Sequence, residues 1–245
     1  NKKSYTKDEC YSYFQEKFRI MVKEVMMTLR EAMEKRHMVR KYKDEVIPQD
    51  VVKALEERIQ ECNQKYSLHF FLKTEDGAAF AELIDKLITK NAKNYIVLAG
   101  DEKEGVEERV GYASADIMLY AQTLGLNTWW VGASFNKEAV AKLSPEHPVY
   151  GVISIGYGET QGTPHASKED FEVCSYEGTV PDWFKEGVEY ALMAPTAYNR
   201  QSFYLKGKGN EVQFTYKEGE FQGIDSGLVK YHFEAAAGKE NFHWV

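Results

Sequence analysis

The chain has 245 residues with a net charge of −7, 43% hydrophobic residues and 28% charged residues, as in an ordinary globular protein with a buried core. The acidic balance argues against non-specific nucleic-acid binding, and no apolar run approaches the roughly 18 residues of a membrane span. Three widely spaced cysteines, Cys10, Cys62 and Cys174, predict neither a disulfide framework nor a metal site. The first twenty residues are polar and lack the apolar segment of a signal peptide. We therefore expect a protein of the reducing cytoplasm that binds neither nucleic acid nor membrane.

Helical and extended patterns mix along residues 28–157. Thr28 and Glu31 form the capping box of a short helix, and Pro48 suits the first turn of a second helix. Gly125 is a natural end for a long helix that precedes it. The expected helices cover residues 29–35, a stretch after 48, 80–88, 106–124 and 137–143, and the expected strands cover 68–72, 95–99, 129–131 and 149–157.

Residues 160–180 are polar and contain Gly162, Pro164 and Gly178, a composition typical of a linker. The later patterns predict a helix at 182–193, a hairpin at 202–216, a helix at 224–237 and a strand at 241–245. Helices and strands do not alternate strictly, which favours an α+β fold over a doubly wound parallel sheet.

Three matches indicate that the second half of the chain repeats the first. Residues 70–73 match 203–206 at an offset of 133 (203 − 70), and the same offset places Pro48 on Pro181. Gly111 then falls on Gly223 (223 − 111 = 112), and residues 127–131 fall on 241–245 (241 − 127 = 114). Matches in the same order, with one deletion of about twenty residues, favour a duplicated unit. We expect an N-terminal extension at 1–27, a first half at 28–165 and a shorter second half at 166–245.

Each half carries a polar motif that the other lacks. The first half has Arg36 and Arg40, whose guanidinium groups share one face if the segment is helical and can then hold a phosphate. A solvated basic turn explains the same pattern. The second half has Asn199 and Gln201. On an extended approach these alternate residues would point both amides the same way, and such amides suit the edge of a heterocycle. A polar turn that bonds to its own backbone is an equal alternative.

Residues 129–133 place two tryptophans beside a glycine, where backbone amides can approach a ligand closely. Two large core side chains on an interior strand are the simpler interpretation. No dinucleotide fingerprint, phosphate loop or nucleophile elbow is present in the sequence.

Taken together, residues 34–42, 124–132, 155–158 and 194–201 resemble the FMN-dependent nitroreductase family over roughly residues 28–245. The resemblance implies a mixed α+β sheet wrapped by helices. In that family two subunits share each flavin, one supplying the basic motif and the other the amide motif. The divided motifs of this chain would then meet at one FMN inside a monomeric pseudo-dimer, although a homodimer stays an alternative.

The resemblance also implies a role for individual residues. The FMN phosphate and ribityl chain would be held by Arg36, His37, Met38 and Arg40, with His165 or Lys168 as a further basic residue. The flavin ring would lie against Pro195, Thr196, Ala197 and Asn199. Its central edge would face Val131, Gly132 and Ala133. Met38 departs from the family pattern because it replaces a serine and removes a hydroxyl donor.

The function implied is an oxidoreductase that passes electrons from NADH or NADPH to a small nitroaromatic or quinone-like acceptor. The flavin would carry the chemistry, so no side chain is expected to act as a general acid or base, and no metal is expected. Alternatives are a different reaction on the same cofactor, such as reductive dehalogenation or flavin fragmentation, a flavin-binding or flavin-sensing protein without turnover, and a relic without cofactor.

Overall fold

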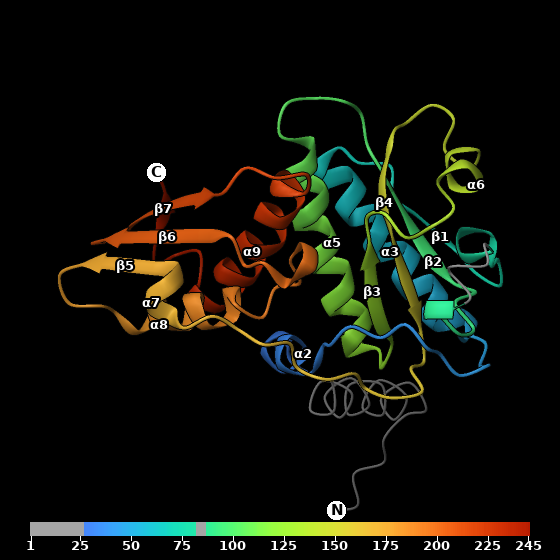
Figure 1. Ribbon diagram of the computed structural model, residues 1–245, viewed down its shortest axis with the longest axis horizontal. Coiled ribbons are helices and arrows are strands. Elements are labelled where there is room, and N and C mark those ends of the chain that lie inside the picture. The colour runs from blue at the N-terminus through green and yellow to red at the C-terminus, as the bar shows by residue number, and fades with distance from the viewer. Residues whose placement is uncertain (1–26, 82–86) are drawn as a thin grey trace, which may run out of the picture.

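A computed structural model of the chain describes residues 27–81 and 87–245. Two four-stranded sheets lie on opposite sides of a central pair of helices (Figure 1). The N-terminal extension and most of the predicted 80–88 helix lie outside the described residues. The α+β fold predicted from the sequence is confirmed.

The first half forms an antiparallel sheet with strand order β1-β2-β4-β3. Thr28 accepts the amide of Glu31, whose carboxylate accepts the amide of Thr28, so the predicted capping box opens the first helix. The elements are α2 (Leu29–Lys35), α3 (Gln49–Tyr66), β1 (Phe71–Lys73), η1 (Ala78–Phe80), β2 (Tyr95–Ala99), α5 (Val106–Thr123), β3 (Asn127–Val131), α6 (Lys137–Ala141) and β4 (Val149–Gly156).

The second half forms a mixed sheet with order β5-β6-β7-β8, in which β6 and β7 make the predicted hairpin. Strands β5 and β8 add to it in parallel. The elements are α7 (Asp170–Val173), β5 (Cys174–Glu177), α8 (Asp182–Ala191), η2 (Ala197–Asn199), β6 (Phe203–Lys208), β7 (Glu211–Tyr216), α9 (Gln222–Ala237) and β8 (His243–Trp244). The prediction of a plain linker over 160–180 is wrong for α7 and β5. Strand β5 is a short edge strand whose hydrogen bonds depend on β6, so local composition carries little sign of it.

One apolar cluster runs through both halves. It joins Ile96 of β2, Ile117 of α5, Leu205 of β6 and Leu228 of α9. A second cluster covers the other face of the first sheet and includes Trp129. All five residues of β2 are buried because the strand is covered on both faces, which explains its uninterrupted apolar sequence.

Corresponding elements of the two halves begin at one of two sequence offsets. Helices α3 and α8 begin 133 residues apart (182 − 49), and each has proline as its N-cap. Helices α5 and α9 begin 116 residues apart (222 − 106), as do strands β3 and β8 (243 − 127). These offsets support a duplicated unit.

Two glycines bring α5 and α9 together in a reciprocal contact. A Cβ on Gly111 would lie 1.9 Å from the carbonyl oxygen of Ile224, and one on Gly227 would lie 2.0 Å from that of Glu108. Both relations have the offset 116 (227 − 111 and 224 − 108), so the sequence offset of 112 at Gly111 is wrong. A slip of four residues keeps the same helix face, so apolar patterns match almost equally well in the wrong register.

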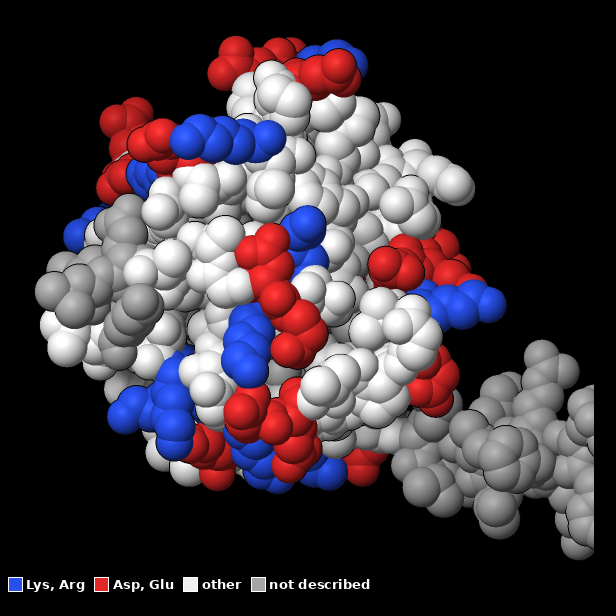
Figure 2. Space-filling view, turned by 90° about the vertical axis from the view of Figure 1, so that its right-hand side faces the viewer, with Lys and Arg blue, Asp and Glu red and all other residues white. Residues whose placement is uncertain are grey.

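Acidic and basic side chains are interspersed over the face of the molecule that carries the first sheet (Figure 2). No helix of the described residues is long and apolar enough to cross a membrane.

Candidate functional site

Arg36 is a buried arginine without an anionic partner in the described part of the chain. Helix α2 ends at Lys35, and Arg36 is its extended C-cap. The side chain is 5% exposed, its Nε has no hydrogen-bond partner, and no ion pair with a described residue offsets its charge. Burial lowers the pKa of Arg36 well below its ordinary value, to about 10. A charge held in this way is a strong candidate to bind an anion.

Two histidines, His37 and His232, interact electrostatically with this guanidinium. Nδ1 of the fully buried His232 donates to the carbonyl of Leu228 at 2.8 Å, which leaves its Nε2 as an unpartnered acceptor. Burial, followed by the charges of Arg36 and His165, lowers the pKa of His232 to about 3. Burial and the same two charges also lower the pKa of His37. The histidines therefore favour neutral forms beside Arg36.

Arg40 lies farther along the same segment. Its guanidinium packs over the ring of Trp129 at 4.6 Å, and its Nε has no hydrogen-bond partner. The predicted helical face shared by Arg36 and Arg40 is wrong, because the chain leaves α2 at Lys35 and runs extended beside Thr128. Four extended residues separate the two Cα atoms by up to about 13 Å, so the two arginines need not contact the same ligand atoms.

The segment 162–168 contacts both polar motifs. Gly162 packs against His37 and Met38. His165 donates from Nε2 to the carbonyl of Leu192 at 2.8 Å, and Lys168 donates from Nζ to the carbonyl of Gln201 at 2.9 Å. The segment therefore links the first-half motif to the second-half motif.

The amide motif does not have the extended approach that the sequence suggested. Tyr198, Asn199 and Gln201 all have φ values near +50°, a backbone conformation that residues other than glycine adopt only at a cost in free energy. The amide of Gln201 is buried and bonds to Lys168 N and Leu192 O. Asn199 is exposed and donates to Ala166 O. Gln201 therefore braces the loop, as the polar-turn interpretation expects, and Asn199 does not point beside it along a strand.

Asp225 holds the same loop from helix α9. Its carboxylate accepts the amide of Ala197 at 3.0 and 3.1 Å and the hydroxyl of Tyr216 at 2.6 Å. Burial nevertheless raises the pKa of Asp225 to about 6, against the opposing effects of Tyr216, Ala197 and Arg200. Nothing in the local sequence distinguishes this residue from an ordinary acidic residue in a first helical turn, and the same holds for His232.

Asp225→Asn is expected to change how stability depends on pH. Because the folded-state pKa is raised, the wild-type carboxyl contributes stability fully below about pH 4, and this contribution is lost as pH rises to about 6. Relative to the variant, the free energy of unfolding of the wild type should fall by at most about 3 kcal/mol over this range. Urea unfolding of both proteins between pH 4 and 7 measures the difference. A difference that stays flat or grows with pH would contradict the assignment.

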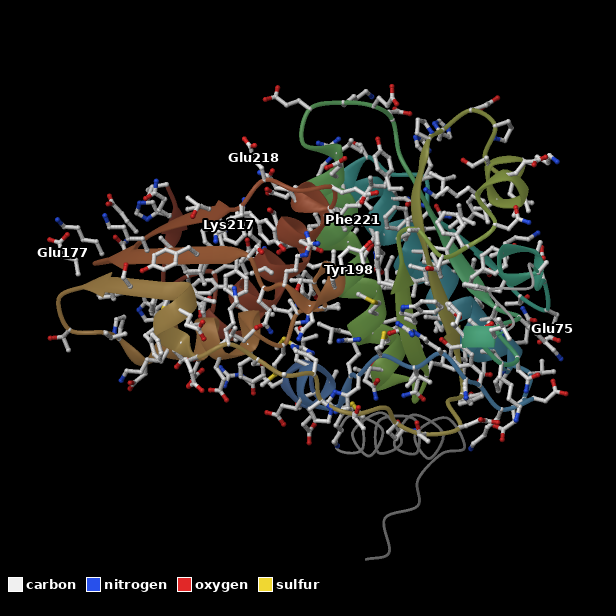
Figure 3. All side chains as sticks on the ribbon, in the orientation of Figure 1. Glu75, Glu177, Tyr198, Lys217, Glu218 and Phe221 are labelled. Atoms are coloured by element: carbon white, nitrogen blue, oxygen red, sulfur yellow. The ribbon has the colours of Figure 1, made fainter. Side chains whose placement is uncertain are left out.

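Gly132 lies where the two halves meet. A Cβ there would lie 2.5 Å from the ring of Phe221 and 2.8 Å from that of Trp130, so any other residue at this position would require one of the two rings to move. The two rings pack edge to face with centroids 6.2 Å apart. Figure 3 shows Phe221 and Tyr198 in the region between the two sheets. Phe221 is the N-cap of α9, four residues before Asp225, so α9 connects Gly132 to the Ala197 loop.

A model of the family described as "Putative TM nitroreductase" matches residues 28–237. A "putative nitroreductase" from Thermotoga maritima has a similar structure, with a TM-score of 0.59 and 20% identity over 86% of this chain and 84% of that one.

Two further proteins of the same description were solved in complex with FMN. The one from Desulfovibrio desulfuricans has a TM-score of 0.51 and 19% identity over 63% of this chain and 99% of its own. The one from Exiguobacterium sibiricum has a TM-score of 0.50 and 14% identity over 60% and 95%. No curated protein matches the chain significantly.

Proposed function

Because the chain belongs to the nitroreductase family whose model matches residues 28–237, we propose that it is an oxidoreductase that holds one FMN between its two halves. FMN is the ligand of the similar proteins from Desulfovibrio desulfuricans and Exiguobacterium sibiricum. The observation that carries the proposal is the buried, unpaired guanidinium of Arg36. It lies beside His232 of the second half, and its charge needs an anion to offset it.

The phosphate of FMN fits this need. Arg36 would supply the main charge–charge interaction and directed hydrogen bonds. His37 lies beside it, and His165 and Lys168 come from the segment that crosses to the second half. Arg40, packed on Trp129, would contact a more distant part of the cofactor. Met38 is half exposed between the two arginines and offers no hydroxyl.

The flavin ring would lie between the Gly132 strand end and the Ala197 loop. Val131, Gly132 and Ala133 would offer backbone amides there, where no Cβ of residue 132 intervenes. Pro195, Thr196, Ala197 and Asn199 would line the other side, in a loop that Asp225 and Gln201 hold in its positive-φ conformation. These residues bind and orient, and none of them is assigned a proton transfer.

The counterpart of the Arg36 region in the other half supports a single FMN site per chain. The helix offset of 116 residues places His232 of α9 on Asp116 of α5 (232 − 116), and Asp116 accepts two hydrogen bonds from Arg58 at 2.6 and 2.8 Å. Tyr112 packs between Tyr66 and Tyr231 in the same region, with ring centroids 5.4 and 5.0 Å away. The arginine here already has its carboxylate, so this position does not call for a ligand anion.

When bound, FMN would accept electrons from NADH or NADPH and pass them to a small nitroaromatic or quinone-like acceptor. Anaerobic addition of NADH or NADPH to the FMN-loaded protein should bleach the flavin absorbance, and a quinone added afterwards should restore it. Free FMN at the same concentration is the control. Absence of bleaching above this control with both donors would contradict the oxidoreductase.

A flavin-binding protein without turnover is the second candidate. Two observations favour it: the missing hydroxyl at Met38, and the contact of the Phe221 ring with Gly132. Such a protein would bind FMN and would transfer no electrons from either donor in the same experiment. Binding and bleaching measured on one sample therefore separate the two candidates.

A further inference from the structure

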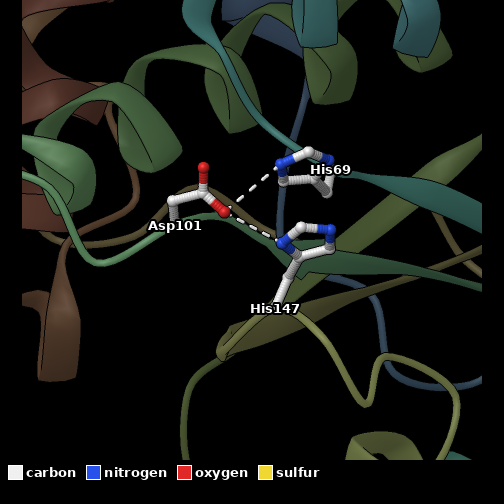
Figure 4. A group of neighbouring side chains, drawn as sticks. All are labelled: His69, Asp101 and His147. Atoms are coloured by element: carbon white, nitrogen blue, oxygen red, sulfur yellow. Dashed lines mark hydrogen bonds and ion pairs between the residues drawn. The ribbon is translucent and has the colours of Figure 1, made fainter.

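Three potential metal ligands meet where three neighbouring strands of the first sheet begin or end. None of them belongs to the candidate FMN site. His69 precedes β1, Asp101 follows β2 and His147 precedes β4. Nδ1 of His147 lies 2.9 Å from Oδ1 of Asp101, and Nε2 of His69 lies 3.5 Å from the same oxygen (Figure 4). The three ligand atoms all lie within 4.8 Å of one another.

The sheet fixes the backbone beside each ligand. The amide of His69 donates to Ala99 O at 2.9 Å, and that of Gly100 donates to Pro148 O at 3.1 Å. These bonds extend the β1–β2 and β2–β4 pairings to the residues at or next to the three side chains. Residues 32 (101 − 69) and 46 (147 − 101) positions apart therefore face one point, a spacing that no local sequence motif would reveal.

The distances suit a transition metal after a small rearrangement. Zinc binds imidazole nitrogen and carboxylate oxygen at about 2.0–2.2 Å, which places tetrahedral ligand atoms about 3.3 Å apart. The two imidazole rings are stacked with centroids 3.5 Å apart and planes 7° from parallel. A metal lies in the plane of each ring that binds it, so the rings must splay. Both side chains are partly exposed, which leaves room for this rotation.

The charge around the site is mixed. Lys103 donates from Nζ to Oδ2 of Asp101 at 3.0 Å, so it opposes a cation. It leaves Oδ1 facing the two histidines, and a metal would replace the contact of Oδ1 with Nδ1 of His147. Glu102 and Lys103 also line a neighbouring cavity of about 730 Å³ that contains Glu107 and Glu108. Two imidazoles and one carboxylate form a ligand set typical of zinc, with positions left for water.

We propose that His69, Asp101 and His147 bind one divalent zinc ion per chain. The same side chains without metal would form only a hydrogen-bonded histidine–aspartate cluster, and the two possibilities differ in a direct binding experiment. The proposal is independent of FMN.

The experiment uses the chelator-treated full chain after removal of any histidine tag. Titration with Co²⁺ should give saturable visible absorption at one ion per chain, and Zn²⁺ should abolish it by competition. His147→Ala and His69→Ala should each weaken Zn²⁺ binding by more than about 100-fold, beyond the loss typical of an outer hydrogen-bond partner. His243→Ala removes a surface histidine of the second sheet, and this variant should bind Zn²⁺ with the affinity of the wild type. Lys103→Gln should bind more tightly.

Circular dichroism of each variant, measured without metal, establishes that it is folded. The proposal is overturned if the wild type shows no saturable Co²⁺ or Zn²⁺ binding. It is equally overturned if the folded His69→Ala and His147→Ala proteins bind with wild-type affinity, since the metal would then lie elsewhere.

Discussion

Replacing Arg36 with methionine is expected to stabilise the FMN-free protein and to weaken FMN binding at the same time. Burial lowers the pKa of Arg36 to about 10, which corresponds to a cost of about 3 kcal/mol for the charged form at neutral pH. An unbranched apolar side chain removes that cost. It also removes the charge-assisted hydrogen bonds to the phosphate, so we expect affinity for FMN to fall by about 100-fold.

Arg58→Met is the matched control. Arg58 is half-buried and paired with the buried carboxylate of Asp116, so its removal leaves that carboxylate unpaired and should destabilise the protein by about 1–3 kcal/mol. Its FMN affinity should be unchanged. Urea unfolding without FMN and fluorescence titration with FMN measure the two quantities for both variants. A less stable Arg36→Met protein with unaltered FMN binding would show that Arg36 has a structural role only.

Gly227→Ala is expected to be strongly destabilising. The added Cβ would lie 2.0 Å from the carbonyl oxygen of Glu108 and 2.5 Å from the amide nitrogen of Tyr112, both backbone atoms that no side-chain rotation can move. Helices α5 and α9 would have to separate along the centre of the core. We expect a loss of about 3 kcal/mol or more, even after the gain of about 1 kcal/mol in helix propensity.

The reciprocal contact at Gly111 leads us to expect a similar loss in the free energy of unfolding. Gly111→Ala places its Cβ 1.9 Å from the carbonyl oxygen of Ile224 and should cost a similar amount. Gly77→Ala is the control, because Gly77 has a negative φ and no atom within 4 Å of its Cβ position; its effect should stay within about 0.5 kcal/mol. Denaturant unfolding of the three variants measures the change in the free energy of unfolding for each of them. Near-neutral values for Gly111→Ala and Gly227→Ala would refute the helix register described here.

Local signals predicted the elements better than they predicted how the halves relate. The Thr28 capping box, Pro48 and Gly125 each marked a helix end correctly, because caps act through neighbouring backbone groups. The short β5 strand was missed because its partner β6 lies about thirty residues later. The offset between α5 and α9 was wrong by one helical turn, since an apolar stripe repeats with that period.

The individual motifs of the site were likewise predicted better than the way in which they come together. Arg36 and the Ala197 loop were proposed from the resemblance. In the structure, residues 162–168 run from a contact with His37, the neighbour of Arg36, to hydrogen bonds with Asn199 and Gln201. The helical pairing of Arg36 with Arg40 was wrong because α2 ends one residue before Arg36. Asp225 and His232 gave no sequence signal, since each matters only for what a distant segment places beside it. Whether these residues hold a cofactor stays a prediction.

The central claim is one FMN per chain, bound between the two halves. Its most direct test is titration of the purified apoprotein with FMN by calorimetry, combined with the molar mass of the same sample from light scattering. We predict a monomer of about the 28.2 kDa chain mass that binds one FMN per chain. Two FMN per chain, or none at any concentration, would contradict the account.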